Sequence, residues 1–293
     1  MRITQSMLSN NMLRNLSNSY TKMDTYMEQV STGKKINRPS DNPVVAMKGI
    51  NYRRQENEAE QYLRNTGEAH NWMDNSDAAL DKATKAMQKL RELAVKASNG
   101  TNDDEEYMSI KAEAKQLKEH LIGLADTKVN GKYIFNGTDT TNSPFDQNGV
   151  FSPNTDPVNI PISAGSELQA NVDGEAVFGN DLFDTVDKFI EKLDDHDVDG
   201  IEEVIGESIE ELDTGINQII DTRAGLGARM NRLELVENRL DDQKIMATKM
   251  MSDNEDVNYS EAITNLITQE FLHRAALSSG SRIIQPTLVD FLR

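Results

Sequence analysis

Apolar side chains near the start of the chain recur at spacings of three and four residues, and this pattern restricts the possible folds more than any other. The set comprises Leu13, Leu16, Tyr20, Met23, Met27 and Val30. Such spacing lines side chains along one seam of a helix, and that seam stays exposed unless a second helix covers it. The sequence therefore predicts a partner helix for residues 1–30.

Matching stripes return only in the last quarter of the chain. One stripe consists of Leu226, Met230, Leu233, Val236 and Leu240, and another of Ile263, Leu266, Ile267 and Phe271. We therefore expect the two ends of the chain to pair with each other, with the remaining segments looped out between them. A protein closed by its own termini is more typical of an assembling subunit than of an enzyme.

The composition supports this interpretation and disfavours several other classes. Aromatic residues make up only 5% of the 293 residues, which favours elongated helices over a large globular core. The 49 acidic against 31 basic residues give a net charge of −18, which would repel the phosphates of a nucleic acid. No apolar run is long enough to insert in a membrane, and residues 1–20 lack the pattern of a secretory signal. The absence of cysteine excludes disulfides and thiolate metal sites.

A loop with helix-breaking residues follows the first helix. Gly33, Pro39 and Pro43 interrupt the helical pattern, and Ser40 or Asp41 is expected to cap a long helix that starts near Val44. That helix is expected to run to Ala97, on the order of 80 Å. Its second half carries a packing seam of small and apolar residues, and a third helix at residues 110–124 folds back on it. The seam comprises Ala69, Met73, Ser76, Leu80, Ala83, Met87, Leu90 and Ala94.

The pattern changes after residue 130, where short apolar runs alternate with turn residues. A strand is predicted at Lys132–Phe135, and the runs at 150–151, 158–162, 168–172 and 176–178 complete a small β-rich insertion. We expect a mainly α protein: an elongated coiled-coil helical bundle formed by the N- and C-terminal segments, with this β-rich outer domain inserted. The expected domains are residues 1–43 with 253–293 (terminal coiled coil), 44–130 with 181–252 (rod-like bundle) and 131–180 (outer domain).

Few residues are candidates for chemistry. Asp195, Asp197 and Asp199 match the first half of an EF-hand calcium loop, but Gly206 stands where the bidentate Glu belongs, so calcium binding stays open. The four histidines are far apart in the sequence, and no phosphate-binding glycine loop or nucleophile motif is present. We therefore predict no catalytic residue, no cofactor and no metal site.

Two motifs resemble the signatures of bacterial flagellins. Ser31-Thr32-Gly33-Lys34-Lys35-Ile36-Asn37, after an amphipathic helix, is similar to the N-terminal signature. A later segment of the chain is similar to the C-terminal signature, and it reads Arg223-Ala224-Gly225-Leu226-Gly227-Ala228-Arg229-Met230-Asn231-Arg232-Leu233. The continuation Pro39-Ser40-Asp41-Asn42-Pro43-Val44 departs from the usual flagellin segment and is similar to the hook-associated protein 3 family, as is Gly131-Lys132-Tyr133-Ile134-Phe135-Asn136-Gly137.

This resemblance implies a structural subunit of the flagellum at the junction of hook and filament. Its implied partners are hook-associated protein 1, flagellin, identical subunits in a ring and a flagellar export chaperone. The resemblance also implies an extracellular location, which the protein would reach through the flagellar type III export channel. A flagellin filament subunit and a cytoplasmic coiled-coil adaptor or sensor are the alternatives.

The terminal helices are the expected assembly interface. Their many Asn, Ser and Thr residues make an isolated helix marginal, so we expect the ends to fold when a subunit docks. On the N-terminal side, the interface residues are Ile3, Met7, Leu13, Leu16, Tyr20, Met23, Met27 and Val30. The C-terminal interface residues are Ile263, Leu266, Ile267, Phe271, Leu288, Val289 and Phe291.

Overall fold

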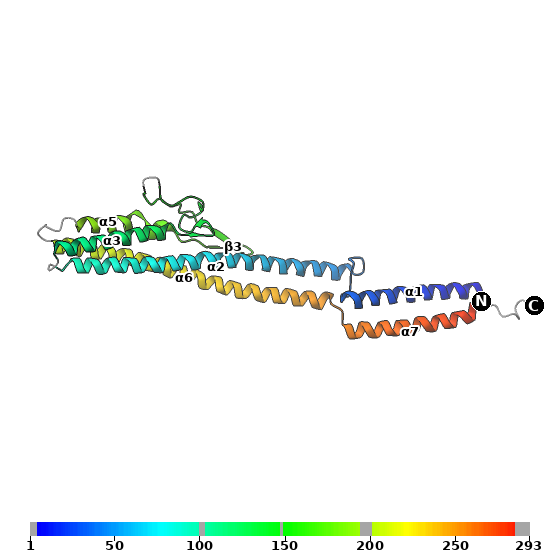
Figure 1. Cartoon of the computed structure of the whole chain (residues 1–293). Coiled ribbons are helices and arrows are strands. Elements are labelled where there is room, and N and C mark those ends of the chain that lie inside the picture. The colour runs from blue at the N-terminus through cyan, green and yellow to red at the C-terminus, as the bar shows by residue number, and fades with distance from the viewer. Residues whose placement is uncertain (1–4, 100–102, 147–148, 194–200, 285–293) are drawn as a thin grey trace, which may run out of the picture. The chain divides into compact units, whose positions relative to one another are not determined.

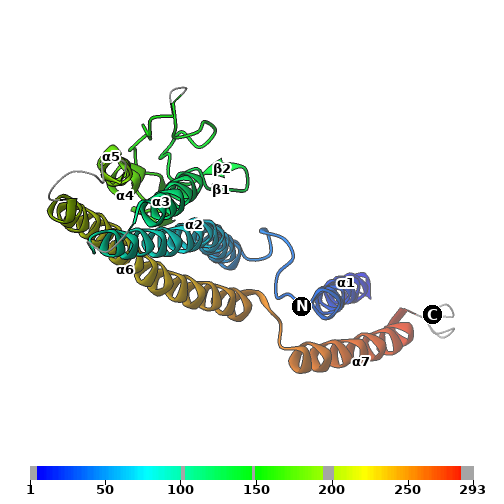
Figure 2. The same cartoon turned by 60° about the vertical axis from the view of Figure 1, so that its left-hand side comes forward.

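The protein is mainly helical, as expected (Figures 1 and 2). The computed structural model describes residues 5–99, 103–146, 149–193 and 201–284. The helices are α1 (Gln5–Thr32), α2 (Pro43–Ala97), α3 (Asp104–Ala125), α4 (Gly174–Phe178), α5 (Asn180–Lys192), α6 (Ile201–Glu255) and α7 (Tyr259–Ile284). The strands are β1 (Lys128–Val129), β2 (Lys132–Tyr133), β3 (Asn159–Ser163) and β4 (Ser166–Gln169).

The chain divides into two compact units, which are described separately. Unit 1 comprises residues 1–58 and 243–293, so it contains both ends of the chain. Unit 2 comprises residues 59–242. The first turns of α2 and the last turns of α6 belong to unit 1, and the rest of both helices belongs to unit 2. The three-domain division drawn from the sequence stays a prediction.

The long second helix is confirmed, but its cap differs from the expected one. Neither Ser40 nor Asp41 caps α2, because the side-chain oxygen of Asn42 accepts hydrogen bonds from the N–H groups of Val44 and Val45, both at 3.2 Å. Pro43 is the first residue of the helix, where no N–H is needed. The Asp41 carboxylate instead accepts from the backbone N–H groups of the preceding loop, which lowers its pKa.

The predicted seam of α2 forms the centre of unit 2. All eight of its residues, from Ala69 to Ala94, are fully buried. Apolar residues of α3, α5 and α6 belong to the same buried cluster, among them Leu121, Phe189 and Leu233. The alternating spacing of three and four residues therefore indicated the buried side of this helix correctly.

Helix α3 folds back along α2, which both views show (Figures 1 and 2). Asp103 caps α3, since its carboxylate accepts the N–H of Glu106 at 2.9 Å. The Tyr107 hydroxyl, buried near the start of α3, donates to the carbonyl of Ala97 at the end of α2, at 3.0 Å. This hydrogen bond joins the two helices at the closed end of their hairpin.

The inserted segment contains two short antiparallel hairpins. Between β1 and β2, Asn130 and Gly131 both adopt positive φ angles, 52° and 78°, which is the geometry that an Asn-Gly hairpin turn requires. Strands β3 and β4 pair with Ile160 opposite Leu168, and a bulge interrupts the pairing between Pro161 and Ser163.

Two expectations for this segment were wrong in part. The strand predicted over 132–135 ends at Tyr133, because Ile134 and Phe135 pack fully buried in the core cluster of unit 2 instead of continuing the ladder. The run at 176–178 lies in the short helix α4, whose start is capped by the Asp173 carboxylate accepting the N–H of Glu175 at 3.0 Å. An apolar run of three residues has no periodicity that separates a strand from a helical turn.

Candidate assembly site

The first and last helices of unit 1 pack against each other. Met12 lies beside Gly280, and Ser19 accepts a hydrogen bond from the Gln269 side chain at 2.8 Å. Since residue numbers rise along α1 as they fall along α7, the two helices run antiparallel. A side chain at Gly280 would meet Met12, because an added Cβ would lie 1.9 Å from the Met12 Cε. The two ends of the chain therefore pair, as the apolar stripes predicted.

About half of the stripe expected on α1 is partly buried in the structure, and the other half is exposed. Most partly buried positions on α1 repeat at spacings of three and four residues, namely Ser9, Met12, Leu16, Ser19, Met23, Tyr26 and Val30, and Gln29 is partly buried as well. Leu16, Met23 and Val30 belong to both sets. Leu13, Tyr20 and Met27 are exposed, whereas Met12, Ser19 and Tyr26 are partly buried, although the Tyr20 ring still contacts the ring of His273 on α7.

The other predicted interface residues form outward stripes on both helices. Leu13, Tyr20 and Met27 are 54, 61 and 60% exposed and lie seven residues apart, and Met7 is 56% exposed. On α7, Ile263, Ile267 and Phe271 are 43, 61 and 72% exposed, whereas Leu266 is partly buried. Ile3, Leu288, Val289 and Phe291 lie outside the described residues. The pair of helices thus presents large apolar side chains to its surroundings.

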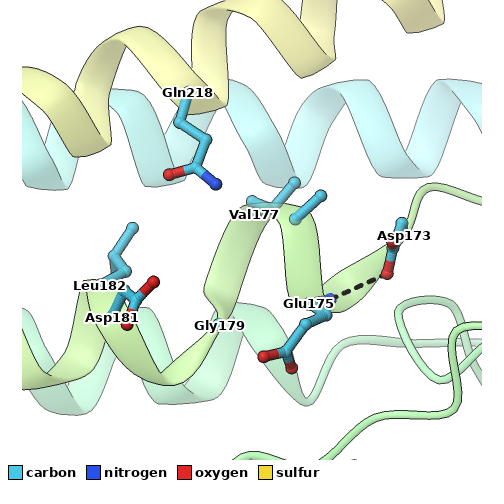
Figure 3. A pocket seen from close by; sticks show the side chains of 8 residues that line it. Asp173, Glu175, Val177, Gly179, Asp181, Leu182 and Gln218 are labelled. Carbon is cyan, nitrogen blue, oxygen red and sulfur yellow. Dashed lines mark hydrogen bonds between the residues drawn. The ribbon is translucent and has the colours of Figure 1, made fainter.

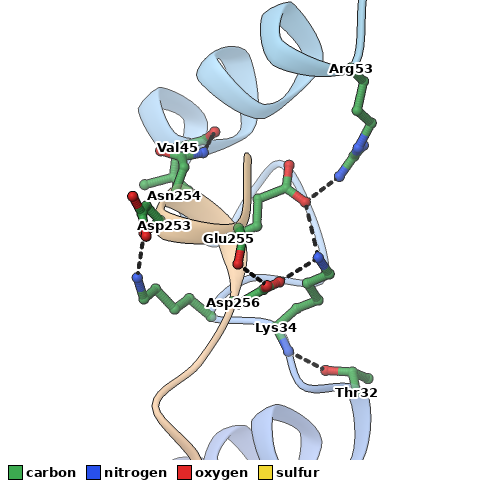
Figure 4. A network of polar contacts seen from close by, with 10 residues as sticks. Thr32, Lys34, Val45, Arg53, Asp253, Asn254, Glu255 and Asp256 are labelled. Atoms are coloured by element: carbon green, nitrogen blue, oxygen red, sulfur yellow. Dashed lines mark hydrogen bonds and ion pairs between the residues drawn. The ribbon is translucent and has the colours of Figure 1, made fainter. Parts of the chain in front are cut away.

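The two chain segments that adjoin these helices are joined by backbone hydrogen bonds (Figure 4). The N–H of Lys35 donates to the carbonyl of Glu255 at 2.6 Å, and the N–H of Val257 donates to the carbonyl of Gly33 at 2.9 Å. Gly33 has a φ of +72°, and a side chain there would also meet the Tyr259 hydroxyl at 2.6 Å. Glycine in the N-terminal signature is therefore required by backbone conformation and by space.

Charged side chains reinforce this connection, which we call the clasp (Lys34, Arg53, Glu255 and Asp256). Lys34 Nζ donates to Asp256 at 2.6 Å, while Arg53 of α2 donates to Glu255 (Figure 4). Glu255 is only 4% exposed, and a Cβ at Gly49 would lie 1.8 Å from its Oε1. The carboxylate thus sits against the glycine and pairs with two cations, since Lys34 Nζ lies 3.8 Å away. The clasp joins two segments that are more than 200 residues apart in the sequence.

The Asp256 carboxylate is stabilised in its charged form. Hydrogen bonds from Lys34 Nζ and from the Ser252 hydroxyl lower the pKa of Asp256 below its usual value. The Asp256 carboxylate is therefore ionised at neutral pH.

Only one side of the clasp carries a recognisable sequence motif. Lys34 and Lys35 belong to the recognised signature, whereas Arg53, Glu255 and Asp256 were not singled out. A lone acidic pair at the end of a long polar helix carries no periodic signal. The buried state of Glu255 follows from Gly49, and that glycine within a helical pattern is the signal that could have indicated a close approach.

The C-terminal signature has a separate role in unit 2. Arg223 donates to both carboxylate oxygens of Asp77 and to Asp81 of α2, and these hydrogen bonds raise the pKa of the arginine. Arg229 donates to the carbonyls of Gln169 at 3.2 Å and Asn171 at 2.9 Å. The motif therefore attaches α6 to α2 on one side and to the β3–β4 hairpin on the other.

A pocket of about 300 Å³ in unit 2 is lined by carboxylates (Figure 3). Asp173, Glu175 and Asp181 approach it, and Val177, Leu182 and Gln218 form other parts of the wall. Within the described residues, no group of three or more His, Asp or Glu side chains is arranged to hold a metal ion. Asp195, Asp197 and Asp199, the candidate calcium ligands, lie outside those residues.

Two of the histidines have contacts within their own units. His70 lies 3.2 Å from Glu237 in unit 2, and the ring of His273 contacts the ring of Tyr20 in unit 1. Across the described part of the chain, the helices lack the combination of length and apolar character needed to cross a membrane.

Two family models match the chain in the expected order. The bacterial flagellin N-terminal helical region matches residues 3–140, and the bacterial flagellin C-terminal helical region matches residues 209–292. The chain belongs to the bacterial flagellin family. The matched regions of this flagellin-family chain contain α1, α7 and every residue of the clasp. The β3–β4 hairpin, α4 and α5 fall between them.

Relatives within the family include junction proteins and filament proteins. Flagellar hook-associated protein 3 of Escherichia coli strain K12 is 26% identical over 92% of this chain and 93% of the relative. A flagellin of Bacillus subtilis strain 168 is 27% identical over 94% of each chain. The crystal structure of flagellar hook associated protein-3 from Legionella pneumophila has a TM-score of 0.63 at 16% identity, covering 69% of this chain and 97% of that chain. That likeness supports the fold.

Proposed function

We propose that this chain is the structural subunit that joins the flagellar hook, through hook-associated protein 1, to the flagellin filament. The observation that carries the proposal is the pair of outward apolar stripes on α1 and α7, where Tyr20, Ile267 and Phe271 are more than 60% exposed. A concentration of large exposed apolar side chains marks a contact surface. In a chain of the flagellin family, neighbouring subunits are the natural cover for it.

Assembly then proceeds by coupled folding of the chain ends. The α1–α7 seam contains Ser9, Ser19 and Gln269, so the pair gains little from its own burial and depends on neighbours for the rest. Folding on docking carries an ordering cost of about 2–5 kcal/mol, which only the assembled contacts offset. This dependence restricts assembly to the growing end of the structure.

The proposal assigns partners to each stage. Identical subunits form a ring that contacts hook-associated protein 1 on one side and flagellin on the other. Before secretion through the flagellar type III export channel, an export chaperone holds the apolar C-terminal helix. Outside the cell, the subunit becomes part of the flagellum.

A filament subunit is the second candidate, favoured by the similarity to the Bacillus subtilis flagellin over 94% of both chains. The segment Pro39-Ser40-Asp41-Asn42-Pro43-Val44 favours the junction role, because it departs from flagellins and resembles hook-associated protein 3. In the structure, this segment forms the Asp41 turn and the Asn42 cap that start α2.

Imaging of a deletion strain tests the proposal. We expect intact hooks without filaments, with flagellin released into the medium, and restoration of filaments by the wild-type gene. Hooks that carry normal filaments would contradict the junction role.

A seeding experiment separates the two candidates. Purified protein added to hooks that end in hook-associated protein 1 is expected to add one layer and stop. Growth of long filaments from the purified protein alone would identify a flagellin instead.

A further inference from the structure

Two Asn-Gly pairs lie in the segment that follows α3, and the structure places them in opposite environments. Asn130-Gly131 forms the turn between β1 and β2, whereas Asn136-Gly137 follows the end of β2. An asparagine before glycine is chemically reactive, because glycine has no Cβ that would hinder attack of its backbone nitrogen on the asparagine side chain. On sequence alone, the two pairs are equivalent. The other Asn-Gly pairs of the chain, 99–100 and 148–149, each contain a residue outside the described part.

Asn130 lies at the tip of a short hairpin. Asn130 and Gly131 are both exposed, and a Cβ added to Gly131 would meet no atom of a more distant residue within 4 Å. Within the described part of the chain, the Asn130 amide has no hydrogen-bond partner. Strands β1 and β2 contribute only two residues each, so few hydrogen bonds hold the turn closed. Such a turn opens at low free energy, and opening lets the Gly131 nitrogen reach the Asn130 side chain.

Asn136 is held in place by hydrogen bonds that oppose the same attack. It is 4% exposed, and its side-chain nitrogen donates to the carbonyls of Asp139 at 2.8 Å and Asn142 at 3.0 Å. Its side-chain oxygen accepts the N–H of Asn154 at 2.7 Å. Gly137 is crowded as well, since an added Cβ would lie 2.4 Å from the Asn154 carbonyl oxygen. The fold therefore restrains both groups that would have to react.

We propose that Asn130 is a site of spontaneous deamidation in the folded protein, which converts this asparagine to aspartate and isoaspartate. The Gly131 nitrogen forms a bond to the Asn130 Cγ while the Cγ–Nδ2 bond breaks, so a five-membered succinimide ring closes within the chain. The amide nitrogen leaves as ammonia and carries the proton that Gly131 loses. Water then opens the ring at either of its two carbonyls, and the two products result.

The two products change the turn in different ways. Both place a new carboxylate in the turn that Lys128 and Lys132 flank in the sequence. Aspartate before glycine is well tolerated in this type of turn. Isoaspartate also carries the main chain through the side-chain carbon, which adds one atom to a turn that has positive φ at both positions. Isoaspartate is therefore expected to weaken the pairing of β1 with β2, and aspartate is not.

Peptide mapping of the full-length protein tests the proposal. The folded protein is incubated at mildly alkaline pH, and trypsin then separates the two sites, because Lys132 lies between them. Mass spectrometry follows the loss of the amide at each asparagine. We expect deamidation at Asn130 to be at least about tenfold faster than at Asn136, a difference of about 1.4 kcal/mol in the barrier. Equal rates, or a faster reaction at Asn136, would overturn the inference.

Unfolding provides the matched control. In urea the local structure is lost, so both pairs are expected to react at rates within about twofold of each other. An equally large difference in urea would show that the neighbouring sequence sets the rates, and it would overturn the inference. An Asn130 that reacts in urea but not in the folded protein would overturn it too. Asn130→Gln, whose longer side chain closes its ring much more slowly, is expected to remove the reaction at this turn.

Hydrogen exchange tests the effect on the hairpin. The N–H of Ile134 donates to the carbonyl of Thr127 at 3.2 Å, directly beyond the pairing of β1 with β2. Exchange at this N–H is expected to be faster in the purified isoaspartyl form than in Asn130→Asp, which carries the carboxylate without the extra main-chain atom. Equal exchange in the two proteins would refute the weakening of the hairpin by isoaspartate.

Discussion

At the scale of single residues, the clasp depends on a buried carboxylate beside a glycine. Glu255 is 4% exposed, and its charge is offset by Arg53 and Lys34. Gly49 leaves the space that this carboxylate occupies. The glycine is therefore retained in the middle of a helix, where alanine would otherwise be favoured by about 1 kcal/mol.

A double-mutant cycle between these two residues is expected to show strong coupling. In the wild type, Gly49→Ala displaces the Glu255 side chain and lowers the stability of unit 1. In a Glu255→Ala background, the same change stabilises by up to about 1 kcal/mol, because helix propensity alone remains. Thermal unfolding of the four proteins measures both effects, and an equal effect of Gly49→Ala in both backgrounds would contradict the packing described.

The clasp is also expected to weaken in acid. Hydrogen bonds from Lys34 and Ser252 lower the pKa of Asp256 in the folded protein, so its contribution is present in full above the unfolded value, about 3.9, and is lost as pH falls through the folded value. Hydrogen exchange at the N–H groups of Lys35 and Val257 is expected to be slower in the wild type than in Asp256→Asn at neutral pH. This difference in exchange rate should disappear once the pH falls below the folded-state pKa of Asp256. A difference that persists at low pH would exclude the carboxylate as its cause.

At the scale of elements, α2 uses different parts of its surface in the two units. In unit 2, its seam from Ala69 to Ala94 is fully buried against several helices. In unit 1, the Val45 carbonyl of α2 accepts a hydrogen bond from Asn254 of α6, and Met47 and Ile50 are exposed. One continuous helix is therefore buried in one unit and carries exposed apolar residues in the other.

Truncation within the buried seam is expected to be costly. Leu80→Ala removes a fully buried side chain, and we expect a loss of about 2–5 kcal/mol in the free energy of unfolding. Met108→Ala is the control, since this residue is 68% exposed and a change of less than about 0.5 kcal/mol is expected. Urea unfolding measures both, and similar losses would contradict the burial of the seam.

The two sides of α1 are expected to respond differently to charge. Leu16→Asp places a carboxylate against α7, so faster hydrogen exchange along α7 is expected together with loss of incorporation. Leu13→Asp lies on the outward stripe, where the residue is 54% exposed, and should block incorporation while α7 keeps its protection. Identical exchange in the two variants would show that the helix is not oriented as described.

At the scale of the whole molecule, the buried cluster and the proposed assembly surface belong to different units. The main cluster of buried residues extends from Ala69 to Leu233, all within unit 2. The clasp and the outward stripes belong to unit 1. The buried cluster and the proposed assembly surface therefore lie in different parts of the chain.

A fragment of residues 59–242 is expected to fold without either chain end. It contains the whole cluster and the Arg223 hydrogen bonds to Asp77 and Asp81, so a cooperative thermal transition is expected by circular dichroism. The fragment is expected not to incorporate into flagella. A fragment without a cooperative transition would show that unit 2 requires the chain ends.

Local patterns in the sequence determined much of this architecture. The length of α2, its buried seam and the pairing of the two chain ends all follow from helical periodicity, which is a property of neighbouring residues. The paired signatures, in their order, indicated the family. These features could be predicted because each depends on a short stretch of chain.

The tertiary structure alone decided which half of the terminal stripe faces inward and which residues complete the clasp. The rotation that turns Leu16 toward α7 and Leu13 away from it depends on how a helix from the far end of the chain packs against α1. Glu255 is buried because Gly49, about 200 residues earlier, leaves room for it. The rotation of a helix about its axis and the space left by one glycine are not encoded in a periodic pattern, so both become visible only when the folded chain brings the segments together.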